Sequence, residues 1–226
     1  MRKLVAFLIL LLVLGVILDR VAVAGAQREI ATRAMAVYDL DTPPEVTIVG
    51  VPFLTQAIAG RYDEVKVDAG AMSVAGVRLS SVDFTLYGIT APLEDLVLRA
   101  DQLDMRAERV AGTVVIPVAT LNQKAPQGIK VAVAGDGLNV DGEITVLGQK
   151  VSAKATMKIE LVKDELRFTP EKVTLGEGIP VPQPERFIAY TIPIKNLPFD
   201  LKVTGVKVVP EGIEVSGEAT DVPLHN

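Results

Sequence analysis

The chain has 226 residues, of which 49% are hydrophobic and only 4% aromatic, and its formal net charge is −5. This length accommodates one domain or two small ones, and an acidic chain with few aromatic side chains lacks the basic, stacking surface that nucleic acids require. Because the chain has no cysteine and its one histidine, His225, is the penultimate residue, we expect no thiol catalysis, no cysteine-ligated metal and no Ser-His-Asp triad.

The N-terminus has the pattern of a targeting segment. Two basic residues precede an uninterrupted apolar run over residues 4–18, which Asp19 and Arg20 end. As a helix this run would span about 22 Å, which is shorter than the roughly 30 Å hydrocarbon core of a bilayer. The small residues of 22–26 then offer cleavage points, as after the apolar region of a secretory signal peptide.

An uncleaved membrane anchor is the second interpretation of this segment. The anchor would extend to Ala26 and hold Asp19 and Arg20 near the far interface, where charged side chains can reach water. Either way, residues 1–26 are predicted to be a signal peptide or N-terminal anchor, and 27–226 a single β-rich domain. The basic N-terminal residues favour the cytoplasmic side, so this domain is expected to be exported into the cell envelope or secreted.

Helical spacing continues through 26–38, and the next elements are short. Pro52 at the start and Gly60 after the end indicate a helix over 52–60. Alternating apolar residues predict strands at 65–69, 77–79 and 82–86. The alternation changes parity at Ser80-Ser81, which predicts a β-bulge there, and it changes again between 96–100 and 103–107.

The second half of the chain reads as a β-meander preceded by a short helix at 117–126. Its clearest strand, 151–161, alternates without a fault and predicts one dry face and one wet face. Tight turns at 148–149 and 163–164 connect it to strands on either side. We further predict a short helix at 185–190 after a Pro-rich loop, and a final hairpin over 199–219.

The dry faces of these strands are built from small aliphatic residues, and two hypotheses explain what covers them. Sheets and helices could pack on one another at normal density. Alternatively, long strands could curl around a helix and leave an apolar slot for acyl chains, because alanines such as Ala69, Ala71, Ala153 and Ala155 leave room for a ligand. Periodicity alone does not separate the two.

Several segments resemble an actinobacterial envelope family, the LmeA-like (lipomannan elongation factor-like) phospholipid-binding proteins. The similar segments are "LDRVAVAGAQREIATR", "GVPFLTQAIAGRYDEVKV", "GLNVDGEITVLGQKVSAKATMKIELVKDELRFTPEKVTLG" and "LPFDLKVTGVKVVPEGIEVSGEA". Together they cover most of the chain, and the match is weakest over 92–127. They are hydrophobic-pattern and turn motifs, and no catalytic residues come with them.

This resemblance implies an α+β, β-rich fold in which a curved antiparallel sheet wraps around helix, a tubular (TULIP-like) lipid-binding architecture with a hydrophobic groove. It also implies non-enzymatic phospholipid binding and transfer at the outer side of the cytoplasmic membrane, in support of lipoglycan and envelope biogenesis. The expected ligand is an anionic phospholipid, phosphatidylinositol-like, with no other cofactor. The membrane is an expected partner, nucleic acid is not, and no protein partner is specified.

The candidate lipid contacts begin with the helix at 52–60. Phe53, Leu54 and Ile58 fall at helical spacing and would either line the slot or dock the helix on the sheet. Arg61 would either bind a phosphate through paired hydrogen bonds or remain a solvated charge. The full candidate set, which also includes an aromatic lip after the Pro-rich loop, is Phe53, Leu54, Ile58, Arg61, Tyr62, Val65, Val67, Phe84, Leu86, Ala153, Ala155, Met157, Phe187 and Tyr190.

Two further functions remain open at the level of sequence. One is a structural or adhesive β-domain at the cell surface, with a filled core and a protein partner. The other is a glycan hydrolase, which would need two carboxylates. Acidic pairs at 63–64, 94–95 and 164–165 all fall at expected turns, where Asp and Glu are common and solvent keeps them ionised. We therefore assign no catalytic and no metal-binding residue.

Overall fold

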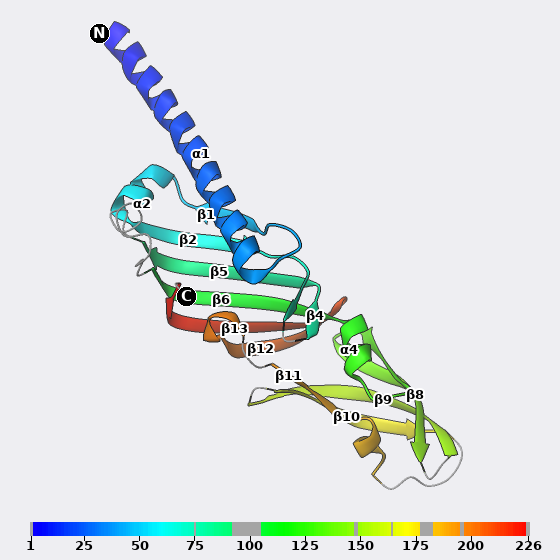
Figure 1. Cartoon of the computed structure of the whole chain (residues 1–226). Coiled ribbons are helices and arrows are strands. Elements are labelled where there is room, and N and C mark those ends of the chain that lie inside the picture. Colours follow the sequence, from blue (N-terminus) through cyan, green and yellow to red (C-terminus); the bar gives the residue numbers. More distant parts are fainter. Residues whose placement is uncertain are drawn as a thin grey trace. The chain divides into compact units, whose positions relative to one another are not determined.

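The computed structural model describes residues 2–74, 76–91, 105–146, 149–163, 165–176, 183–194 and 197–224 (Figure 1). The helices with described bounds are α1 (Arg2–Tyr38), α2 (Phe53–Ala59) and α4 (Val118–Lys124), together with the 3-10 helices η2 (Pro184–Phe187) and η3 (Pro198–Asp200). The remaining elements are strands, and the predicted class, α+β with curved antiparallel sheets, is confirmed.

The strands form two larger sheets and one small one. The first sheet has the order β1-β2-β5-β6-β13-β12, with bounds β1 Glu45–Val49, β2 Arg61–Asp68, β5 Ser81–Thr90, β6 Arg106–Pro117, β13 Gly212–Pro223 and β12 Lys202–Val209. The second has the order β11-β10-β9-β8-β7, with bounds β11 Tyr190–Pro193, β10 Glu165–Leu175, β9 Gln149–Val162, β8 Gly137–Val146 and β7 Ile129–Ala134. β3 (Met72–Val74) and β4 (Val77–Leu79) pair with each other.

The chain divides into two compact units. Unit 1 contains Met1–Gly70, Asp83–Gly112 and Glu218–Asn226, and unit 2 contains Ala71–Val82 and Thr113–Gly217. Unit 1 therefore holds α1, α2, β1 and β2, whereas unit 2 holds α4 and the whole second sheet. The assignment of 27–226 to one domain stays a prediction.

Helix α1 has an exposed part and a packed part. Residues 4–18 are exposed all around the helix, and α1 is long and apolar enough to cross a membrane. Packing begins at Asp19: Asp19, Val23 and Ala31 are buried, and the side-chain amide of Gln27 donates a hydrogen bond to the carbonyl of Val46 in β1. Positions spaced by four residues lie on one face of a helix, so this stripe fixes α1 along the edge strand of the first sheet.

Most of the predicted elements are confirmed. The helix over 52–60 is α2, the helix over 117–126 is α4, and the meander with its hairpins is β8, β9 and β10. The last hairpin is also present, as β12 and β13. These elements share one property, which is that local signals suffice: turn residues at both ends and an unbroken alternation between them.

Three local predictions are wrong. The change in alternation at Ser80 marks the boundary between two strands and not a bulge within one strand. β4 ends at Leu79 and pairs with β3, whereas β5 begins at Ser81 and pairs with β2. The helix expected at 185–190 is the single 3-10 turn η2, followed by β11 from Tyr190 onward. The second parity change, between 96–100 and 103–107, falls largely outside the described residues.

The third error concerns the dry face of β9. Four of its members, Val151, Ala153, Ala155 and Met157, are buried as expected. Ile159 is only half-buried and Leu161 is exposed. Both lie close to the hairpin that connects β9 to β10, where fewer neighbouring elements are available to cover the strand.

Candidate functional site

The candidate lipid contacts on β2 and β5 form two neighbouring rows on the first sheet. Val65 pairs with Leu86 and Val67 with Phe84, and strand β1 extends both rows on its side. Val65 and Leu86 are buried, whereas Val67 and Phe84 are half-buried. Directly paired side chains on one face lie within contact distance of one another, so unit 1 carries an apolar strip across three strands.

Helix α2 precedes this strip and is too short to be stable by itself. It begins after Pro52 and ends at Gly60, whose φ of 64° is the left-handed conformation that closes a helix. Only Phe53 packs inward, with its ring centroid 6.1 Å from that of Tyr62. Leu54 is 36% exposed and Ile58 75% exposed. The alternative in which all three apolar residues dock the helix is therefore wrong for Ile58.

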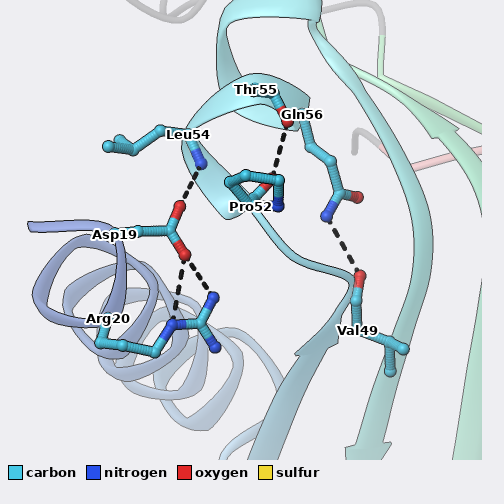
Figure 2. A network of polar contacts seen from close by, with 7 residues as sticks. All are labelled: Asp19, Arg20, Val49, Pro52, Leu54, Thr55 and Gln56. Atoms are coloured by element: carbon cyan, nitrogen blue, oxygen red, sulfur yellow. Dashed lines mark hydrogen bonds and ion pairs between the residues drawn. The ribbon is translucent and has the colours of Figure 1, made fainter. Parts of the chain in front are cut away.

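Polar contacts hold α2 in place (Figure 2). The Gln56 side chain joins both flanking strands, because its amide nitrogen donates to the Val49 carbonyl at 3.2 Å and its amide oxygen accepts from the Asp63 N–H at 3.1 Å. The Thr55 hydroxyl donates to the Pro52 carbonyl at 2.8 Å. These bonds tie a short, uncharged helix to the ends of β1 and β2.

A charged side chain of helix α1 makes a further contact. The carboxylate of Asp19, which is 3% exposed, accepts a hydrogen bond from the Leu54 N–H at 2.8 Å, and its other oxygen is paired with the guanidinium of Arg20. Pro52, which precedes α2, has no side chain that could cap it. Asp19 therefore satisfies one of the free N–H groups that every helix start presents, and Arg20 compensates the charge that burial would otherwise penalise.

Arg61 and Tyr62 lie at the start of β2, directly after α2. A guanidinium nitrogen of Arg61 is 2.9 Å from a Glu108 carboxylate oxygen, and both side chains are mostly exposed. An exposed pair of this kind is weak. The phosphate contact of Arg61 stays a prediction. Burial raises the pKa of the Tyr62 phenol, which keeps it neutral.

Three candidates in unit 2 lie on the inner face of the second sheet. Ala153, Ala155 and Met157 are all buried, so protein atoms already cover them in the absence of ligand. Their cross-strand partners on β8 are Gly142, Val140 and Leu138. Small residues therefore occupy the middle of this face.

Phe187 and Tyr190 have different surroundings in the structure. Phe187 is exposed, as a lipid-facing lip requires, whereas the ring of Tyr190 stacks on Phe168 with centroids 4.5 Å apart and an interplanar angle of 3°. The Tyr190 hydroxyl is buried and finds no hydrogen-bond partner among the residues that the structure describes. Burial raises the pKa of this phenol, so it remains a neutral donor. An unpaired buried hydroxyl is costly and is suited to a polar group of a ligand.

The chain was compared with models of protein families. The model of the LmeA-like phospholipid-binding family matches residues 17–218, which include the packed part of α1, the second sheet, the first sheet up to the middle of β13, and every candidate named above. The chain belongs to this family. No match was found among curated proteins or among solved structures.

The match to the LmeA-like family begins within the last residues of the apolar run, before Asp19. The matched range thus takes in the stripe that packs α1 on the first sheet. Sequence reasoning identified Asp19 only as the end of an apolar run and missed its contact with α2. The four-residue spacing of Asp19, Val23, Gln27 and Ala31 was the signal that could have revealed a packed face.

The acidic pairs do not assemble into a catalytic arrangement within the described part of this LmeA-like protein. Asp63 is exposed, and Glu64 has its carboxylate 3.2 Å from the ammonium group of Lys66. The pair at 94–95 and Asp164 lie outside the described residues. Among those described, no group of three or more His, Asp or Glu side chains could hold a metal ion.

Proposed function

We propose that this protein binds phospholipid in the apolar interior of its sheets and transfers it at the outer side of the cytoplasmic membrane, without catalysing a reaction. The main support for this proposal is the match of the phospholipid-binding family model over residues 17–218. Supply of lipid to lipoglycan and envelope biogenesis is the role that we assign to this activity. An anionic, phosphatidylinositol-like headgroup fits the exposed Arg61.

Elementary energetics support retention of a lipid. Each buried methylene contributes about 0.8 kcal/mol, so one long acyl chain outweighs the cost of ordering the ligand and its surroundings. The small side chains of β8 and β9 supply apolar surface, and the unpaired hydroxyl of Tyr190 supplies one hydrogen-bond donor. A buried apolar face with a few polar groups is the usual character of a small-molecule site.

The packing of α1 supports a retained anchor over a cleaved signal peptide. Cleavage after Ala24 or Ala26 would remove Asp19 and Val23 from the folded protein. Unit 1 would then lose two members of the stripe that packs on it, and α2 would lose the carboxylate at its start. We therefore propose that residues 2–18 remain attached and hold the protein in the membrane, with Asp19 and Arg20 at the interface; local thinning of the bilayer accommodates an apolar run shorter than its core.

Replacing Ala155 with Phe tests the proposed transfer. Ala155 lies between Val140 and Val173 on the inner face of the second sheet, so the added ring would occupy space that we assign to an acyl chain. We expect Ala155→Phe to reduce transfer of a pyrene-labelled phospholipid between vesicles several-fold. Because Ala155 is buried, the added ring should also lower the free energy of unfolding by roughly 1–3 kcal/mol, so transfer is compared per folded molecule.

The matched control is Thr156→Phe, which places the same ring on the exposed face of the same strand. It should leave transfer unchanged. Suppose instead that each folded Ala155→Phe molecule transfers lipid normally. The inner face would then be ordinary protein core, as in a structural β-domain, and the proposed function would be wrong.

A further inference from the structure

Three exposed apolar side chains lie on helix α2 or directly before it. Val51 is 77% exposed and Ile58 75% exposed, and Leu54, one helical turn before Ile58, is also exposed. No charged residue occurs between Val51 and Gly60. Outside α1, five of the described large apolar side chains are exposed, and three of these five lie in this one short segment. We name Val51, Leu54 and Ile58 the α2 patch.

The position of the α2 patch along α1 is fixed by the hydrogen bond from Leu54 to Asp19. Asp19 is the residue at which the exposed apolar part of α1 ends and its packed part begins. Helix α2 contacts α1, and Figure 1 shows the N-terminal part of α1 projecting away from the strands of unit 1. The patch therefore lies where α1 would leave a bilayer.

We propose that the α2 patch is a second membrane-contact surface, inserted into the interface of the same bilayer leaflet from which α1 emerges. Apolar side chains on a short uncharged helix gain free energy by entering the boundary between headgroups and acyl chains. Arg61, directly after α2, carries an exposed guanidinium whose ion pair with Glu108 is weak, so it supplies a cation at the level of anionic headgroups. Asp19 acts as a positioning residue, because it sets the depth of α2 relative to the anchor.

This inference rests on the retained anchor of the proposed function, and it adds a consequence for lipid entry. Gly60 alone joins α2 to β2, the strand that carries Val65 and Val67 of the apolar strip. A patch held in the interface would bring the start of β2 to the headgroup level, where a phospholipid can leave the bilayer.

Single-cysteine labelling tests the contact directly, because the natural chain has no cysteine. The full chain carrying Ile58→Cys would be labelled with the environment-sensitive fluorophore NBD and reconstituted into phosphatidylcholine–phosphatidylglycerol vesicles containing nitroxide-labelled lipid. We expect blue-shifted emission and several-fold quenching by the nitroxide. The matched control is Val37→Cys, an exposed apolar position on α1 about 27 Å beyond Asp19 along the helix axis. NBD at this position should show the emission of a fluorophore in water and no quenching by the nitroxide.

Two further variants separate the possible failures. Leu12→Cys, in the exposed apolar part of α1, reports whether the anchor itself is inserted. Quenching at position 12 with an aqueous signal at position 58 would overturn the α2 contact and leave the anchor intact; aqueous signals at both would overturn the α2 contact and the anchor together. Adding Asp19→Ala to the Ile58→Cys chain should reduce quenching at least twofold, and unchanged quenching would contradict the positioning role of Asp19.

Discussion

Replacing Phe168 with Ala is expected to lower the free energy of unfolding by about 3–5 kcal/mol, the usual cost of removing a buried aromatic ring. Phe168 is fully buried, pairs with Ile159 across β9 and β10, and stacks on Tyr190 of β11. Its removal would leave a cavity that three strands border. Urea unfolding of the full chain in mild detergent, followed by circular dichroism, measures the change.

The same substitution at Phe187 is the control, since Phe187 is exposed. Surface changes of this kind stay within about 0.5 kcal/mol. If Phe168→Ala were as stable as Phe187→Ala, the packing of β10 against β11 described above would be incorrect. A smaller loss together with a changed denaturant dependence would instead indicate a less compact native state.

Gly142→Ala should be the second most damaging change, with an expected loss of about 3 kcal/mol, at the upper end of the range for overpacking. A Cβ atom at Gly142 would collide with the carbonyl oxygen of Gly128 and approach the Cα of Ile129 to 2.9 Å. The carbonyl of Gly128 cannot simply move away, because it accepts a hydrogen bond from the Glu143 N–H at 3.1 Å. The strain therefore falls on the backbone of β7 and β8.

Gly205→Ala is the matched control, and it should raise the free energy of unfolding. Gly205 lies inside β12, and a Cβ atom there meets no other atom within 4 Å. Replacing a strand glycine without a steric conflict should stabilise by about 0.5–1 kcal/mol, because the unfolded chain loses freedom. Equal stabilities for Gly142→Ala and Gly205→Ala, from thermal or urea unfolding, would refute the close approach of β7 and β8.

The parts of the fold that sequence predicts well are those with local signals. Pro52 and Gly60 delimit α2, and the alternation of β9 with short turns at both ends defines the meander. The dry face of β9 was predicted too long, because alternation records the direction of a side chain and not the presence of a neighbour to cover it. Leu161 has the correct parity and is still exposed.

The candidate site depends on contacts that sequence does not display. Asp19 and Leu54 are 35 residues apart, and only the folded chain shows that the carboxylate of one caps the helix of the other. In the same way, the exposure of Ile58 cannot be derived from helical spacing, which is identical for a docked and an undocked helix. The break at Ser80 was missed because a bulge and the end of a strand produce the same change of parity.

Native mass spectrometry of the purified full chain tests phospholipid binding most directly. After exchange through a detergent that strips surface lipid, we expect the folded protein to appear above its chain mass of 24.1 kDa by the mass of one phospholipid, which lipid extraction would identify. The Ala155→Phe chain should carry markedly less. A folded wild-type chain that appears only at its own mass, and takes up no phospholipid from vesicles, would contradict the account.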